Sequence, residues 1–216
     1  MRNRFDKQLD MLNDSLIEMG TMCEEAISIA SLSLFKKDFG AQVSVTSLES
    51  EIYQKEREIE SLCLKLFIEQ QPVARDLRQI SATLKIITDM KRIGNQATNI
   101  SDISSSLNDF DYNRCKKIQN MVLAVSEMLK TSIDSYISKN LKLAESVIAS
   151  DDIVDKLFIE IKSDLINFIS KEPSQAENAI DLLMICKYLE KIGDHAENIA
   201  RWIEFYITGE HKGEDL

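Results

Sequence analysis

The chain has 216 residues, of which only two are proline and six are glycine, while 44% are apolar. Turns and strand edges depend heavily on proline and glycine, so this composition argues against a many-stranded sandwich or barrel. The formal net charge is -10. No run of five or more Lys or Arg offers a basic surface to a phosphate backbone, so we expect no nucleic-acid partner.

No segment has the pattern of a signal peptide or of a membrane span. The first residues lead into an amphipathic pattern without an apolar core of about 7–15 residues, and nowhere do about 18 apolar residues follow one another. The four cysteines, Cys23, Cys63, Cys115 and Cys186, lie among apolar neighbours without a CxxC motif, which predicts buried, reduced thiols. We therefore expect a cytoplasmic protein without membrane insertion.

Apolar residues recur at helical spacing almost throughout the chain, and five interruptions divide it into six predicted helices. Each helix has roughly 25–33 residues and is therefore about 40–50 Å long at 1.5 Å per residue. Long antiparallel helices joined by short connections are typical of helical bundles. The interruptions fall at residues 36–40, 70–72, 104–111, 138–140 and 171–174.

The chain also contains an internal repeat. Residues 93–100 match residues 192–199 at five of eight positions, with an offset of 99 residues. Pro72 and Pro173 precede the two copies at nearly the same offset, and each opens the helix that carries the match. This pattern predicts an all-α fold of two tandem three-helix-bundle repeats. The predicted domains are residues 1–108 and 109–216.

A glycine stands at the same place in both copies of the repeat. Gly94 and Gly193 lie in mid-helix, where glycine costs about 1 kcal/mol relative to alanine. The simplest physical reason to tolerate this cost twice is a close approach of two helices, which we therefore predict at both positions.

Four acidic residues form two pairs at i, i+4 spacing, Asp151 with Asp155 and Glu190 with Asp194. Residues four apart share one helix face, and the two pairs lie at similar distances from the predicted turn at Pro173. If the helix rotations agree, four carboxylates converge, and such oxygen ligands suit iron, manganese, magnesium or calcium. The alternative is a solvated acidic face. Glu190 and Asp194 lie roughly opposite the apolar stripe of their helix, so any metal would sit at the bundle surface.

The first hairpin, which turns at Pro72, contains a degenerate counterpart of this site at the same distances from its turn. Glu49 and Asn95 stand in the places of Asp151 and Asp194, and Tyr53 and Lys91 stand in the places of Asp155 and Glu190. Only one carboxylate is left, and Lys91 brings a positive charge to the place of a cation. We hypothesise that a Lys91–Glu49 ion pair replaces the metal there.

No catalytic residue is evident, so we expect no enzyme. A ferritin-like di-iron centre needs Glu-x-x-His twice, yet the only histidines are His195 and His211, and Ile192 stands three residues before His195. Cys186 is out of phase with His195, and no glycine-rich phosphate loop is present. We expect His195 to pack or to form a hydrogen bond.

Arg75 and Arg78 lie in the predicted first turn of the helix that Pro72 opens. The simpler interpretation is an N-terminal helical turn, with Asp76 near the positive end of the helix dipole. The functional alternative is that the two arginines dock a partner or lock two helices together.

Several of these segments resemble the PhoU family of phosphate-signalling regulators, and the resemblance covers essentially the whole chain. It implies a cytoplasmic, often dimeric adaptor that links a phosphate ABC transporter, through its ATPase subunit, to a sensor histidine kinase. Such an adaptor restrains uptake and the starvation response when phosphate is plentiful. The matching segments are residues 1–6, 71–78, 188–200 and 208–210.

The resemblance also implies multinuclear iron or zinc bound through Glu/Asp-x-x-x-Asp motifs. In this chain those motifs fall on Asp151–Asp155 and Glu190–Asp194, whereas Glu49–Tyr53 and Lys91–Asn95 depart from them. Two other classes stay open. One is an enzyme with a carboxylate-bound metal centre for phosphoester or redox chemistry, and the other is a purely structural, oligomerising bundle.

Overall fold

A computed structural model describes residues 2–36, 39–69, 73–107 and 116–210. The all-α prediction and the number of long helices are confirmed, and the described residues contain no β-strand. The helices have 23 to 35 residues. They are α1 (Arg2–Lys36), α2 (Phe39–Glu69), α3 (Ala74–Ser106), α4 (Lys116–Ser138), α5 (Leu141–Lys171) and α6 (Ala176–Thr208), with a short 3-10 helix η2 (Pro173–Gln175) between the last two.

Helix ends fall where the periodicity breaks. Asn140 caps α5, since its side chain accepts a hydrogen bond from the backbone N–H of Lys142 at 3.1 Å. Gly209 ends α6 with a φ of 81°, and its N–H donates to the carbonyl of Phe205 at 2.8 Å. The break predicted at Pro72 lies outside the described residues, as does the predicted boundary between residues 108 and 109.

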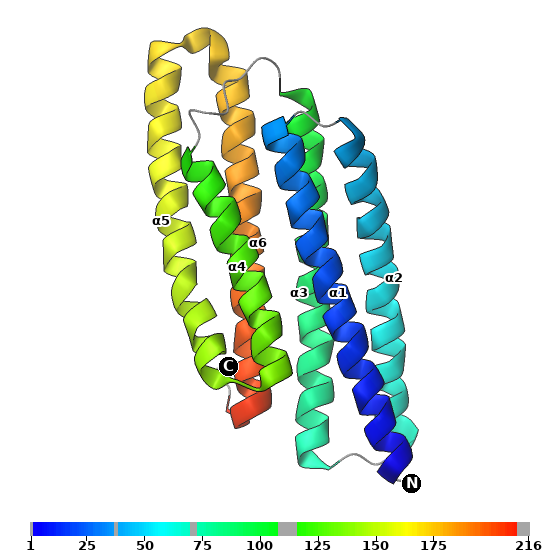
Figure 1. The fold of residues 1–216 in the computed structure, drawn as a ribbon. Helices are drawn as coiled ribbons and strands as arrows, with labels where there is room; N and C mark the ends of the chain where they lie inside the picture. Colours follow the sequence, from blue (N-terminus) through cyan, green and yellow to red (C-terminus); the bar gives the residue numbers. More distant parts are fainter. Residues whose placement is uncertain (1, 37–38, 70–72, 108–115, 211–216) are drawn as a thin grey trace.

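Two three-helix units lie side by side, with α2 and α5 at the outer edges (Figure 1). The end of α5 and the start of α6 lie at the opposite end of the molecule from the end of α2 and the start of α3. Helices α3 and α6 form the most extensive helix pair and join the units. They run antiparallel, because Asp89 of α3 contacts His195 of α6 while Gln79 contacts Tyr206.

Two helices approach each other closely at each of the two repeated glycines. A Cβ on Gly94 would lie 3.1 Å from Cδ1 of Ile52 on α2, and a Cβ on Gly193 would lie 3.2 Å from Cγ1 of Val154 on α5. Both distances are tighter than ordinary van der Waals contact. The prediction of close approach at both glycines is therefore confirmed.

Apolar side chains fill the bundle, including the buried thiols of Cys23, Cys63 and Cys186. Burial raises the pKa of Cys63 to about 12, so this thiol stays protonated and unreactive. The buried-thiol prediction is confirmed for these three, and Cys115 lies outside the described residues. None of the described helices has an apolar stretch of the length needed to cross a lipid bilayer.

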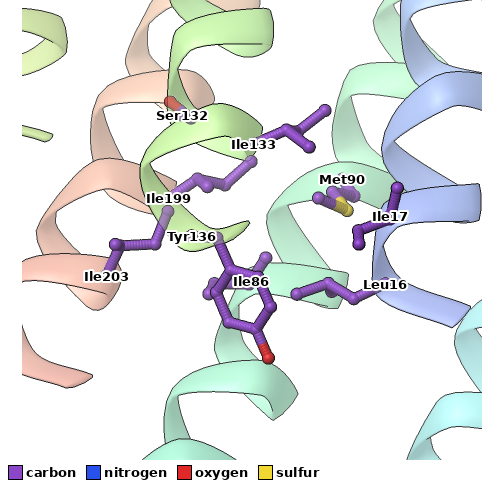
Figure 2. A pocket seen from close by; sticks show the side chains of 9 residues that line it. All are labelled: Leu16, Ile17, Ile86, Met90, Ser132, Ile133, Tyr136, Ile199 and Ile203. Carbon is purple, nitrogen blue, oxygen red and sulfur yellow. The ribbon is translucent and has the colours of Figure 1, made fainter. Parts of the chain in front are cut away.

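A small cavity lies between the two units (Figure 2). Its lining side chains come from α1, α3, α4 and α6 and include Leu16, Met90, Ile133, Tyr136 and Ile203. Its volume is about 10 Å³, which is close to the minimum for a single water molecule. This cavity cannot hold an organic substrate, so it belongs to the packing between the units.

Candidate cation site and its first-repeat counterpart

The acidic cluster of the second repeat lies along the seam between α5 and α6. Asp151 is half-buried, and its Oδ1 is enclosed without a hydrogen-bond partner. This oxygen faces Gly193, where a Cβ would stand 3.3 Å away. The Glu190 side chain is only 13% exposed and that of Asp194 33%, whereas Asp155 is exposed. The helical wheel predicts exposed side chains for Glu190 and Asp194. Both side chains are more buried than this prediction, because α5 packs closely over Gly193.

The carboxylates of this cluster act on one another electrostatically. The pKa of Asp151 is raised from 3.8 to about 7, first by burial and then by the charges of Glu197, Asp155, Asp194 and Glu190. Sequence analysis missed Glu197. Its position seven residues after Glu190 was the available signal, since that spacing returns to the same helix face. The acidic cluster therefore consists of these five residues.

Two lysines on α6 already pair with part of the acidic cluster. Lys187 Nζ lies 2.7 Å from the Glu190 carboxylate, and Lys191 Nζ pairs with Asp194 and lies 3.5 Å from Glu190. The hydrogen bond to Asp194 is the main cause of a raised pKa for Lys191. Among the described residues, Asp151 has no such cation partner.

The donor set fits a hard cation in chemistry but is not preassembled. Carboxylate oxygens are the ligands such ions prefer, and the enclosed, unpartnered Oδ1 of Asp151 sits where other carboxylates disfavour its negative charge. Within the described parts of the chain, however, no three Asp, Glu, His or Cys side chains are grouped closely enough to hold a metal ion. Binding would require Glu190 and Asp194 to turn away from their lysines.

The first-repeat counterpart has a different ion pair from the one we hypothesised. Lys91 pairs with Glu56 at 2.7 Å, not with Glu49, and it lies 5.5 Å above the ring of Tyr53. Glu49 has a different partner. With its amide nitrogen turned toward the acceptors, Asn95 donates to Glu49 Oε1 at 3.0 Å. An ammonium group nevertheless occupies this hairpin, as the sequence indicated.

His195 forms a buried hydrogen bond between the two repeats. Its Nδ1 lies 2.9 Å from Oδ1 of Asp89, and both side chains are almost fully buried. The expectation of a hydrogen-bonding role is confirmed, but the partner on α3 was not foreseen.

The two arginines of α3 lie in different surroundings. Arg75 is exposed and Arg78 is half-buried. Arg78 lies against the C-terminal end of α6, where a Cβ on Gly209 would collide with its Nη1. Only Arg78 is therefore positioned to connect two helices, and it brings a positive charge to the negative end of the α6 dipole.

The raised pKa of Asp151 predicts a pH-dependent gain of stability in the Asp151→Asn variant. Between pH 3.8 and about 7 the Asp151 carboxyl of the folded chain holds a proton that the unfolded chain has released, so the contribution of Asp151 to stability falls as the pH rises through this range. At pH 8 we expect Asp151→Asn to raise the free energy of unfolding by about 1–2 kcal/mol, after allowance for solvent screening. The gain should vanish near pH 4.

Urea unfolding at pH 4 and pH 8 measures this difference, with the variant of the exposed neighbour, Asp152→Asn, as the control. An equal effect of the two substitutions, or a gain that persists at pH 4, would contradict the raised pKa.

Comparison with known proteins places the chain in a family. The family model of the PhoU domain matches residues 16–104 and again residues 118–203. The chain belongs to the PhoU family. The first match includes Gly94 and the second includes Gly193, and the whole acidic cluster lies within the second match.

Individual PhoU relatives are similar over nearly their full length. The Clostridium acetobutylicum protein is 36% identical over 210 residues, covering 96% of both chains, and the Borreliella burgdorferi protein is 30% identical, covering 97% of both. Each is named as a phosphate-specific transport system accessory protein PhoU homolog. The crystal structure of PhoU from Pseudomonas aeruginosa has a TM-score of 0.89 and 26% identity, covering 95% of this chain and 100% of that one.

The crystal structure of the phosphate transport system regulatory protein PhoU from Streptococcus pneumoniae also superposes, with a TM-score of 0.89 at 22% identity, and covers 97% of this chain and all of that one. At this identity the likeness supports the fold alone. The PhoU-like arrangement of two tandem three-helix units is thus shown by both comparisons of structure and by the repeated domain.

Proposed function

We propose that this chain is a cytoplasmic regulator of phosphate uptake and of phosphate-starvation signalling. It acts as an adaptor between the ATPase subunit of a phosphate ABC transporter and a sensor histidine kinase, and it restrains both when phosphate is plentiful. The observation that carries the proposal is the PhoU domain match in both halves of the chain, with full-length relatives named as accessory proteins of phosphate-specific transport.

The structure supports an adaptor in preference to a catalyst. The interior is filled with apolar side chains, and the cavity between the units has room for no more than one water. The polar groups instead lie along helices of up to 35 residues, which offer extended faces to other proteins. We therefore propose that the chain binds other proteins and does not catalyse a reaction. The proposal includes a homodimer as the functional form.

Deletion of the gene provides the first functional test. In phosphate-rich medium we expect a starvation reporter to be switched on and phosphate uptake to rise, because the restraint is lost. Restoring the wild-type gene should reverse both effects. The adaptor proposal fails if the reporter and the uptake rate stay unchanged in the deletion strain.

We further propose that the acidic cluster binds a divalent cation, with iron or zinc as the candidates that the family resemblance supplies. When bound, the ion would contribute positive charge, which offsets the repulsion among the carboxylates around Asp151. Asp151, Asp155, Glu190 and Asp194 would hold it, once the last two leave Lys187 and Lys191. The support is the chemistry of the donor set and the enclosed oxygen of Asp151.

Metal content by mass spectrometry on untagged protein tests the cation proposal. We expect a stoichiometric metal in the wild type that is lost in Glu190→Gln/Asp194→Asn and kept in the matched first-repeat variant Glu49→Gln/Glu56→Gln. Absence of metal from all three proteins would make the acidic cluster a solvated or partner-facing surface, and equal loss in both variants would move the site elsewhere.

A further inference from the structure

An exposed apolar strip continues from the acidic cluster along the outer face of α5 and α6. It consists of Ile159, Ile166, Ile180 and Met184, which are 67%, 56%, 56% and 40% exposed. Ile159 and Ile166 are seven residues apart on α5, with the exposed Lys162 between them, and Ile180 and Met184 are four apart on α6. Each apolar pair therefore shares one helix face. Ile166 and Ile180 stand equally far from Pro173 and therefore lie at the same height.

Contacts on α5 fix the direction in which this strip faces. Asp164 pairs with Lys117 of α4 at 2.8 Å, so the side of α5 that carries Asp164 faces α4. The ring of Phe158 lies under Lys187 of α6 at 5.3 Å and so marks the seam with α6. Ile166 is about 160° around the helix from Asp164, which places the apolar strip beside the seam, on the side away from α4.

The fold does not require apolar residues at these positions, because the first repeat lacks most of them. At the offset of 102 residues between α2 and α5, Ile159 corresponds to Arg57 and Ile166 to Leu64. At the offset of 99 residues between α3 and α6, Ile180 and Met184 correspond to Ser81 and Lys85, which are both exposed. The combination of these four apolar positions is thus particular to the second repeat, whereas the first repeat exposes a different apolar pair on α2, Leu64 at 51% and Ile68 at 82%.

The charge next to the apolar strip defines the chemistry of its partner. Lys187 and Lys191 are already paired with Glu190 and Asp194, whereas Asp151 and Asp155 form no ion pair within the described residues. A surface that is apolar at one end and anionic at the other is complementary to a helix with an apolar face and basic residues at one end.

We propose that the apolar strip and the acidic cluster together dock one amphipathic helix of a partner protein. Its apolar residues pack on Ile159, Ile166, Ile180 and Met184. Its Lys or Arg side chains lie against Asp151 and Asp155 when no cation is bound there, so that a basic helix and a cation are alternative partners of these two carboxylates. The face from Asp151 to Ile166 is about 22 Å long at 1.5 Å per residue, which matches a helix of about 15 residues. The proposal deepens the adaptor function and rests on it only for its biological setting.

Binding of a synthetic probe tests this docking surface. The probe is a fluorescent 18-residue peptide with leucines along one helix face and four lysines at one end, and its control has the same composition in shuffled order. In anisotropy titrations we expect Ile166→Ser/Ile180→Ser to bind the probe about tenfold more weakly than the wild type. The matched first-repeat variant Leu64→Ser/Ile68→Ser should bind it unchanged. Asp151→Asn/Asp155→Asn should reduce the salt dependence of binding.

Four results would overturn the proposal. Equal binding of the shuffled peptide would show unspecific charge attraction, and equal losses in the two serine variants would place the surface elsewhere. An unchanged salt dependence in Asp151→Asn/Asp155→Asn would show that the basic end of the peptide does not contact these two carboxylates. If sedimentation shows that Ile166→Ser/Ile180→Ser dissociates a dimer, the occupant is a second copy of this chain. These outcomes are independent of the phosphate phenotype of the deletion strain, so the docking surface and the adaptor function can fail separately.

Discussion

Replacing Asp89 with alanine is expected to lower the free energy of unfolding by about 2–3 kcal/mol. The Asp89 carboxylate is buried and lies 2.9 Å from Nδ1 of His195, on the other repeat. Its only other ion pair among the described residues is a long one, 3.9 Å to the exposed guanidinium of Arg92. Removing the carboxylate leaves a buried ring nitrogen without a partner, which is the more costly half of a lost hydrogen bond.

Urea unfolding of Asp89→Ala, His195→Ala and the double variant measures the coupling between the two repeats. We expect a coupling energy of about 1–2 kcal/mol. The control is Asp102→Ala, which removes an exposed aspartate from the same helix and should cost under about 0.5 kcal/mol. Additive losses for Asp89 and His195 would show that their contact does not stabilise the junction.

A buried polar network reinforces the same junction between the repeats. The amide nitrogen of Gln79 donates to Asn13 at 2.8 Å, and the hydroxyl of Tyr136 donates to Asn13 at 2.7 Å. The hydroxyl of Tyr206 donates to Gln79 at 3.3 Å, so four helices from both repeats share one set of hydrogen bonds. Because apolar packing alone allows sliding between helices, such satisfied polar contacts favour one register of α3 against α6.

The arrangement within each hairpin could be predicted from the sequence because it depends on local rules. Helical periodicity gives the elements, and a short turn fixes which residues are level. Gly193 does approach Val154 and Asp151, and Gly94 approaches Ile52, as those rules require. The repeat adds a second, independent indication of the same register.

The partners of individual polar side chains could not be predicted, because they depend on helix rotation, on side-chain conformation and on how the two repeats pack. Lys91 pairs with Glu56 although Glu49 is at a comparable height, and Glu49 instead accepts a hydrogen bond from the Asn95 amide. The contact of Asp89 with His195 depends on how the two repeats pack. No spacing within one repeat carries that information, so these residues were recognisable only in the folded chain.

Replacing Gly193 with valine is expected to destabilise the second hairpin by about 1–3 kcal/mol. Even a Cβ would lie 3.2 Å from Val154 and 3.3 Å from Oδ1 of Asp151, and the two further methyl groups of valine reach about 1.5 Å beyond it. Helix α5 must then move outward. Gly193→Ala is the matched control, because its gain in helix propensity of about 1 kcal/mol offsets the tight contact.

The same substitution tests whether close packing creates the unusual state of Asp151. If valine moves α5 away from α6, water reaches the enclosed carboxylate, and the burial that is the first cause of its raised pKa is relieved. The contribution of Asp151 to stability is expected to fall between pH 4 and pH 7. We expect this fall to be smaller in Gly193→Val than in Gly193→Ala when both are unfolded in urea across that range. An identical pH dependence in the two variants would mean that the neighbouring carboxylates, and not the close helix approach, set the charge state of Asp151.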